Sequence, residues 1–211
     1  MGKKINISDL DEIIIKPGDL VIDCGANVGK VTDYFSSKGA KVIAFEPNQF
    51  AFSYLKEKFK YNPEVDVINK GVAGNSFVGK NKLFLHQESI NNPLLYSSGS
   101  SIIEDKNNIN KDDFQIIEII DLSQFIKDLN RAVKLLKIDI EGAEIGLLND
   151  LIDQRIIHNI PYVIVETHEK KIPSLIEPTK KLRKRIIDEK LYNINFIITN
   201  FTSFNLSSCI L

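Results

Sequence analysis

The segment Val21-Ile22-Asp23-Cys24-Gly25-Ala26-Asn27-Val28-Gly29 decides the fold of this 211-residue chain. It is an apolar run that enters a glycine-containing turn, and the residues after it, Lys30 to Ser37, carry helical spacing. Small residues at such a turn let a ligand approach the backbone, and the start of the helix offers free N–H groups. The segment therefore predicts a strand, a ligand-binding turn and a helix.

The rest of the chain repeats this alternation of strand and helix. Near-continuous apolar runs are typical of strands covered on both faces, and their alternation with helices predicts an α/β fold with a doubly wound, mostly parallel sheet. The expected strands are Leu20 to Asp23, Val42 to Glu46, Val65 to Asn69, Leu135 to Ile140 and Tyr162 to Glu166. The expected helices are Lys30 to Ser37, Gln49 to Tyr61, Ala143 to Arg155 and Leu175 to Lys190.

One long segment, Gly71 to Arg131, interrupts the alternation after the third strand. It contains expected strands at Lys82 to His86 and Phe114 to Ile120, separated by a Ser/Gly/Asn-rich stretch from Asn91 to Asn110. Insertions of this length are usually functional, so we interpret the segment as a lid or wall over the substrate.

Composition fits one domain, 1–211, that acts on a small molecule. The chain is 43% hydrophobic, and its net charge of −1 gives no global field that would attract nucleic acid or an anionic membrane. Met1 to Leu10 lacks the pattern of a signal peptide, and no apolar run approaches the ~20 residues of a membrane span. We expect a cytoplasmic protein, with neither Cys24 nor Cys209 in a disulfide.

Two acids at expected strand ends indicate a cationic nucleoside ligand. Asp23 can face an ammonium group directly or through water, and Glu46 can accept two hydrogen bonds from a ribose diol. S-adenosylmethionine has both groups. The alternative is that Gly25 and Gly29 only make a tight turn and that Glu46 caps a helix.

A nicotinamide-dependent oxidoreductase or epimerase is the rival enzyme class. Its Gly-x-Gly-x-x-Gly fingerprint would need glycine where this chain has Asn27 and Lys30. A Tyr-x-x-x-Lys pair is also missing from a suitable place, since Tyr54 and Lys58 lie in the helix after Glu46. A binding module that kept the fold and lost its chemistry stays open as the non-enzyme alternative.

Four motifs together resemble the FkbM family of methyltransferases. The most specific is Lys137-Ile138-Asp139-Ile140-Glu141-Gly142-Ala143-Glu144, because generic class I methyltransferases share only the glycine turn and the acid after it. The others are Ile22 to Gly29, Phe45-Glu46-Pro47 and Val165-Glu166-Thr167-His168.

This resemblance implies a Rossmann-like class I methyltransferase fold, whose seven-stranded sheet has an antiparallel C-terminal strand. We expect two tail runs, Ile194 to Ile198 and Phe201 to Leu206, to form a closing antiparallel hairpin. The resemblance also implies S-adenosylmethionine as methyl donor and O-methylation of a hydroxyl on a sugar, glycan or other small-molecule acceptor. The compact N-terminus and short tail leave room for a cap from another chain, and so for a homo-oligomer.

Several residues are expected to bind the donor. Asn69 and Val72 follow the third strand, where class I methyltransferases usually contact adenine, although an ordinary turn is the alternative. By the resemblance, the polar loop Ser97 to Ser101 forms a wall near the donor carboxylate, with a flexible linker as its alternative. The expected donor-binding residues are Asp23, Gly25, Ala26, Asn27, Gly29, Glu46, Asn69, Val72 and Asp139.

The catalytic candidates follow two neighbouring strands, whose carboxyl ends meet at the ligand crevice. His168 is favoured as general base or acceptor-orienting group, because its usual pKa near ~6.5 suits proton transfer at neutral pH. Asp139 and Glu141 are expected to position the methionine end of the donor or the acceptor. A variant places Mg²⁺ or Mn²⁺ among Asp139, Glu141, Glu166 and His168. The alternative without chemistry is that Glu141 caps the next helix and His168 bonds a loop.

Two other features are interpreted as structural. The basic run Lys180, Lys181, Arg183, Lys184 and Arg185 shares a helix with apolar residues and is read as a solvated face, not an RNA site. His86 and His158 are read as structural or surface residues.

Overall fold

The strand predicted at the start of the deciding segment is β1 (Leu20–Cys24), and all five of its residues are buried. It lies in the middle of a six-stranded, all-parallel sheet of order β3-β2-β1-β7-β8-β9. The structure is a computed structural model, and it describes Leu10 and residues 13–197. The other strands of this sheet are β2 (Lys41–Phe45), β3 (Val65–Ile68), β7 (Leu135–Ile138), β8 (Tyr162–Glu166) and β9 (Ile194–Ile197).

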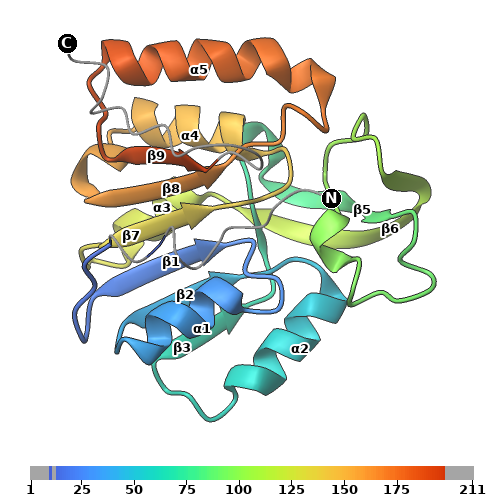
Figure 1. Cartoon of the computed structure of the whole chain (residues 1–211), viewed down its shortest axis with the longest axis horizontal. Helices are drawn as coiled ribbons and strands as arrows, with labels where there is room; N and C mark the ends of the chain where they lie inside the picture. The colour runs from blue at the N-terminus through green and yellow to red at the C-terminus, as the bar shows by residue number, and fades with distance from the viewer. Residues whose placement is uncertain (1–9, 11–12, 198–211) are drawn as a thin grey trace.

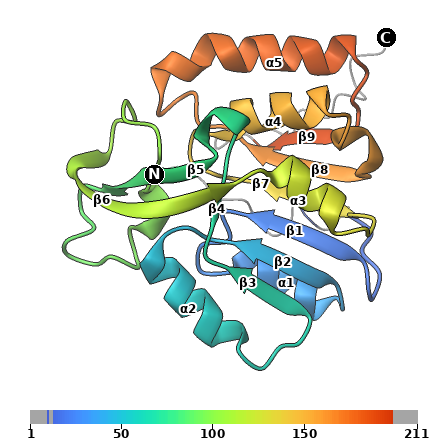
Figure 2. The ribbon, with the colours of Figure 1, turned by 180° about the vertical axis from the view of Figure 1, so that it is seen from behind.

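Helices cover both faces of the sheet and make a three-layer arrangement. In Figure 1, α1 lies in front of the sheet, and the reverse view in Figure 2 brings α3 to the front. Because successive side chains of a strand point to opposite faces, Ile22 packs into the core under α3, α4 and α5, while Val21 packs under α1 and α2. The helices are α1 (Lys30–Ser37), α2 (Gln49–Phe59), α3 (Leu122–Asp128), α4 (Glu144–Asp153) and α5 (Ile176–Asp188).

The predicted α/β fold class is confirmed, and the five expected core strands and four expected helices all end within two residues of their predicted bounds. The short helix α3 was not expected, although its start carries a readable signal. Asp121 caps it by accepting a hydrogen bond from Gln124 N at 3.1 Å, the Asp-x-x-Gln spacing of a helix start.

The first tail run forms the strand β9 (Ile194–Ile197), which runs parallel to β8. The reason is that α5 crosses over between these two strands and returns the chain in the same direction. The second tail run, Phe201 to Leu206, lies outside the described residues, and so does the antiparallel closing strand expected there.

The interrupting segment forms a second sheet, of order β4-β6-β5. Its strands are β4 (Gly71–Val72), β5 (Gly79–His86) and β6 (Ile109–Ile120), and β5 pairs antiparallel with β6. The two strands expected in this segment are thus confirmed, and both begin earlier than predicted. Figure 1 shows β5 and β6 beyond the carboxyl ends of the central strands, which is the edge where α/β proteins bind ligands.

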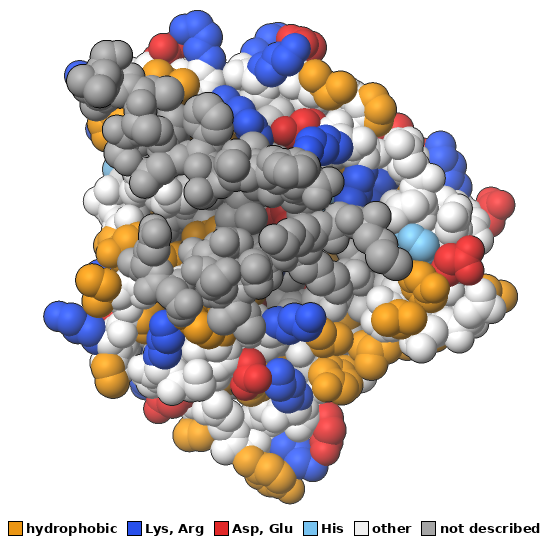
Figure 3. Space-filling model, viewed as in Figure 1, with side chains coloured by type: hydrophobic (Ala, Val, Ile, Leu, Met, Phe, Trp, Pro, Cys, Tyr) orange, Lys and Arg blue, Asp and Glu red, His pale blue; other side chains and the backbone are white. Residues whose placement is uncertain are grey.

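Four of the five basic residues in the run on α5 form ion pairs with neighbouring acids. Lys180, Lys184 and Arg185 pair with acids three or four residues away in the sequence, and Arg183 pairs with Glu169. On the face seen in Figure 3, basic and acidic side chains are likewise interspersed. No helix in the described part of the chain is long and apolar enough to cross a membrane.

Gly25 gives the first testable prediction. Its φ is +77°, and a Cβ there would lie 1.9 Å from the backbone oxygen of Asp139, which follows the adjacent strand β7. Gly18 is the matched control, because its φ is +84° but a Cβ there meets nothing within 4 Å. Gly18→Ala should therefore cost only the left-handed strain, roughly 1–2 kcal/mol. Gly25→Ala should cost about 4 kcal/mol or more in unfolding free energy.

Urea unfolding of both variants measures the difference. Equal, small losses for the two variants would show that the ends of β1 and β7 are not packed this closely.

Candidate active site

The glycine turn after β1 is held against the end of β2. Gly25 N and Ala26 N both donate to Phe45 O at 3.0 Å, and Asn27 takes a left-handed conformation with φ of 49°. Gly25 and Asn27 line both cavities described below, and Ala26 lines the larger one. Gly29, also left-handed, packs instead on α2, since a Cβ there would lie 2.4 Å from Leu55.

Beneath the turn lies a buried ion pair. Asp23 is fully buried; its Oδ1 lies 3.1 Å from Lys137 Nζ, and its Oδ2 accepts a hydrogen bond from Thr32 at 2.7 Å. Lys137 Nζ also donates to Gly25 O at 2.8 Å. Burial lowers the pKa of Lys137, but the charges of Asp23 and Asp139 outweigh burial and raise it. Asp23 thus faces Lys137 and lines neither cavity, so its predicted contact with a ligand ammonium stays a prediction.

Glu46 stands just past the end of β2 with both carboxylate oxygens fixed. Oε2 accepts from Asn27 N at 2.7 Å, and Oε1 accepts from Asn48 N at 2.8 Å. Burial raises the pKa of Glu46 to about 7, against the lowering effect of these two N–H groups and of Lys137. Asn69, which follows β3, supports the backbone at Glu46, because its side-chain amide donates to Glu46 O at 2.9 Å.

Two cavities meet at the turn, and both are lined by Gly25, Asn27, Ser98, Asp139 and Glu141. The narrow one, ≈ 80 Å³, has Glu46 on its wall and is otherwise largely apolar, with Phe45, Val72, Leu83, Ile117 and Ile119 among its lining. The larger one, ≈ 550 Å³, is more polar and extends over the turn. They lie where the strand order reverses between β1 and β7, the switch point of a doubly wound sheet.

The interrupting segment forms the outer wall of both cavities. Ser97 Oγ accepts from Asn27 Nδ2 at 2.7 Å, and Ser100 Oγ accepts from Asn48 Nδ2 at 3.1 Å. The predicted polar loop is therefore bonded to the turn and to the start of α2. His86, interpreted above as structural, lines the larger cavity and stacks on Tyr96 with ring centroids 5.0 Å apart.

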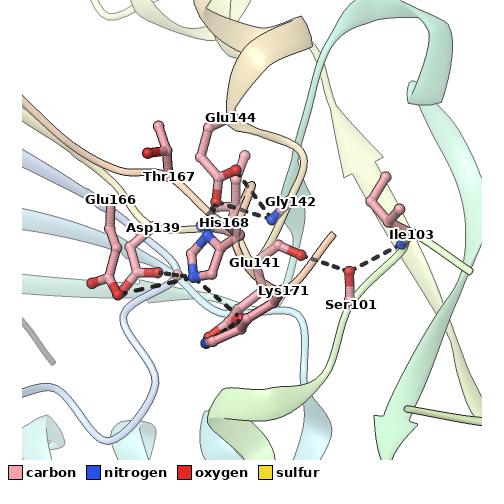
Figure 4. A network of polar contacts seen from close by, with 12 residues as sticks. Ser101, Ile103, Asp139, Glu141, Gly142, Glu144, Glu166, Thr167, His168 and Lys171 are labelled. Carbon is pink, nitrogen blue, oxygen red and sulfur yellow. Dashed lines mark hydrogen bonds and ion pairs between the residues drawn. The ribbon is translucent and has the colours of Figure 1, made fainter. Parts of the chain in front are cut away.

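His168, after β8, is buried among carboxylates, as Figure 4 shows. Its Nδ1 lies 2.8 Å from Glu144 Oε1, and its Nε2 lies 3.3 Å from Glu141 Oε2 and 3.7 Å from Asp139 Oδ1. Burial lowers the pKa of His168, but Glu144 and Glu141 outweigh burial and hold it well above its usual value. This shift favours the protonated imidazole, whereas a general base must be neutral.

The pKa values of the other acids of this cluster are shifted in different directions. Glu141 has a left-handed φ of 52°, which aims its carboxylate at Lys106, 2.8 Å away, and Lys171, 3.4 Å away. Burial raises the pKa of Glu141, but His168 and these lysines outweigh it and hold the pKa well below its usual range. Burial raises the pKa of Asp139, and burial together with Asp139 raises that of Glu166 to about 8.

Three residues of the candidate site could not be predicted from the sequence: Lys106, Lys137 as a partner of Asp23, and Glu144. Glu144, not Glu141, satisfies the backbone before α4, accepting from Ile140 N and Gly142 N at 3.1 and 3.0 Å. Two of these residues carry a signal in the sequence. Lys137 is a lysine inside an otherwise apolar strand, and Glu144 is a second acid at the start of a helix. Lys106, in an irregular stretch, gave no such signal.

A left-handed turn at the switch point, an apolar slot and a buried carboxylate on its wall define the class: an α/β protein with a candidate ligand site at the switch point of its sheet. The family model of the methyltransferase FkbM domain matches residues 23–192. The chain therefore belongs to the FkbM methyltransferase family.

Two relatives illustrate how far the similarity extends. The AMB antimetabolite synthetase AmbE of Pseudomonas aeruginosa is 26% identical over 198 residues, which covers 76% of this chain and 9% of AmbE. The crystal structure of methyltransferase FkbM from Methylobacillus flagellatus KT is 16% identical, with a TM-score of 0.48, and the match covers 82% of this chain and 39% of that one. The chain thus spans less than half the length of each.

The pKa of Glu46 yields the second prediction. In the free protein its carboxyl is mostly protonated below about pH 7. A ribose diol donates to the charged form and so lowers the pKa in the complex, which means that binding releases a proton and strengthens as the pH rises. Affinity for S-adenosylhomocysteine should rise about tenfold between pH 6 and 8 and then level off.

Calorimetric titration across this range checks the expectation, with Glu46→Gln as the control whose affinity should be low and flat with pH. An affinity that falls with rising pH, or stays constant in the unaltered protein, would contradict the ribose contact.

Proposed function

We propose that the chain is an S-adenosylmethionine-dependent methyltransferase that methylates a hydroxyl group of a sugar, glycan or other small-molecule metabolite. The observation that carries the donor assignment is the position of Glu46. Its two carboxylate oxygens are held by Asn27 N and Asn48 N, and the side chain forms part of the wall of an apolar slot. Each oxygen keeps a lone pair for one hydroxyl of a ribose diol.

The residues around the two cavities fit the parts of this donor. The narrow cavity, with Val72 and Ile119 on its walls, suits a flat adenine ring. The glycine turn and the larger, more polar cavity suit the amino-acid part, for which the small residues Gly25 and Ala26 offer a close approach. Asp139 lines both cavities and would face the reacting end. When bound, the donor supplies an electrophilic methyl carbon on a positively charged sulfur.

The larger cavity supports a hydroxylated acceptor. The stacked His86–Tyr96 pair offers a flat face, and Lys170 and Lys171 line the same cavity. Transfer forms a bond from the acceptor oxygen to the methyl carbon and breaks the bond from that carbon to sulfur, which keeps the electron pair. The chain must hold the two molecules in line and receive the hydroxyl proton. Asp139 lines both cavities and could receive this proton, and His168 lies behind it, with Nε2 3.7 Å from Asp139 Oδ1. His168 would have to be neutral to act as the base.

The rival enzyme class is less well supported. A nicotinamide dinucleotide needs close backbone approach along its pyrophosphate, whereas Asn27 carries a side chain bonded to Ser97 at this turn. A binding module without chemistry would need no buried cluster of His168 with several acids, which is costly to keep.

Calorimetric titration with S-adenosylmethionine, S-adenosylhomocysteine and NAD tests the proposal. The two adenosyl ligands should bind in the micromolar range, and Glu46→Ala should weaken both roughly a hundredfold, because two hydrogen bonds to a charged group are lost. Glu57→Ala is the matched control, since Glu57 is an exposed acid on the neighbouring helix α2.

Binding of NAD alone would sink the methyltransferase assignment. Binding of none of the three ligands by the folded protein would favour the module without chemistry.

A further inference from the structure

The acid cluster contains a buried ring nitrogen that has no hydrogen-bond partner among the described residues. His168 is 2% exposed, and its Nε2 makes no hydrogen bond although three carboxylates surround it. Figure 4 shows this nitrogen facing Asp139 and Glu166. A buried polar atom left unpaired costs free energy. The position of Nε2 therefore indicates that a ligand binds there.

The other ring nitrogen of His168 is fixed by a carboxylate. Nδ1 lies 2.8 Å from Glu144 Oε1, and Glu144 is itself fully buried and held by Ile140 N and Gly142 N. Donation from Nδ1–H to Glu144 leaves the lone pair on Nε2, which points into the cluster. A carboxylate behind a histidine in this way is the common support of a metal-binding imidazole, because it fixes the tautomer and the ring orientation.

The spacing of the ligand atoms suits one small cation. One atom from each of Asp139, Glu141 and His168 lies within 4.8 Å of the other two. Nε2 lies 3.3 Å from Glu141 Oε2, 3.7 Å from Asp139 Oδ1 and 3.9 Å from Glu166 Oε1. Ligands about 2.1 Å from an octahedral ion are separated by roughly 3.0 to 4.2 Å, so these atoms are already near binding distance.

We propose that Asp139, Glu141 and His168 Nε2 bind a divalent cation, with Glu166 at its edge and Glu144 as the positioning residue behind the histidine. Carboxylate oxygens with one imidazole favour Mn²⁺ or Mg²⁺ over a thiolate-seeking metal. Asp139 and Glu141 are partly exposed to the cavities, with side chains 24% and 18% accessible, which leaves coordination positions open.

The position of this site indicates a class of acceptor, a conclusion that rests on the proposed function. Asp139 and Glu141 line both cavities, so the ion would lie between donor and acceptor. Open positions on such an ion accept two neighbouring oxygens of one molecule, as in a vicinal diol or a 2-hydroxy acid. Bound in this way, a hydroxyl is both oriented and made more acidic.

Mn²⁺ titration of the full chain, freed of metal by a chelator, tests the site without any catalytic assay. Loss of the free Mn²⁺ paramagnetic signal should show one saturable site per chain, with Kd below about 1 mM. Pulsed electron paramagnetic resonance should detect ¹⁴N coupling from a coordinated imidazole, and this coupling should disappear in His168→Ala.

Variants separate direct ligands from support. Asp139→Asn should weaken binding roughly tenfold or more, and Glu144→Gln roughly ten- to hundredfold while keeping a reduced ¹⁴N coupling. Glu177→Gln, an exposed acid on α5, is the control that should bind as the unaltered protein does. Circular dichroism confirms that each variant is folded.

No saturable Mn²⁺ binding by the folded chain, or unchanged affinity in Asp139→Asn, would overturn the site. Its failure is distinguishable from that of the proposed function, because S-adenosylhomocysteine binding without metal binding would leave the methyltransferase assignment intact. Mn²⁺ binding without adenosyl-ligand binding would support the metal site and contradict the methyltransferase assignment.

Discussion

A buried ammonium group, that of Lys137, ties the ends of the two central strands together. Its Nζ lies 3.1 Å from Asp23 on β1 and 3.6 Å from Asp139 after β7, and it donates to the backbone oxygen of Gly25 in the turn. A buried charge is costly unless it is paired and hydrogen-bonded, so this contact fixes the relative height of β1 and β7. This contact of Lys137 therefore positions the glycine turn, the cavity wall beside it and Asp139, the first residue of the acid cluster.

The same constraint explains how the proposed donor site is connected to the acid cluster around His168. Gly25 lies so close to Asp139 that no side chain fits between them, and both line the two cavities. The proposed donor site depends on Glu46 and Asn27, held by backbone contacts across β1 and β2. The acid cluster depends on Glu144, which fixes both the loop before α4 and the ring of His168. The proposed site is thus built from fixed strand ends, with the β5–β6 sheet closing the outer side.

Much of this arrangement could be predicted from the sequence, because strand ends in a parallel sheet must converge. Apolar runs located β1, β2, β7 and β8, and polar residues within two positions of the ends of the last three gave Glu46, Asp139 and His168. The sequence could not show which partner each polar side chain faces, nor the direction of the last described strand. Asp23 reads as a ligand contact until Lys137 is seen facing it, and Glu141 and Glu144 are interchangeable as helix-start acids until one is seen to accept the backbone N–H groups. Lys106 reaches Glu141 from an irregular stretch, where no periodicity indicates position. The direction of β9 likewise depended on α5 crossing the sheet.

The most direct test of the central claim is a crystal structure of the protein with S-adenosylhomocysteine bound. We expect the ribose hydroxyls on Glu46, the adenine in the narrow cavity beside Val72, and the thioether sulfur directed toward Asp139 and His168. A ligand bound elsewhere, or bound with its ribose away from Glu46, would contradict it.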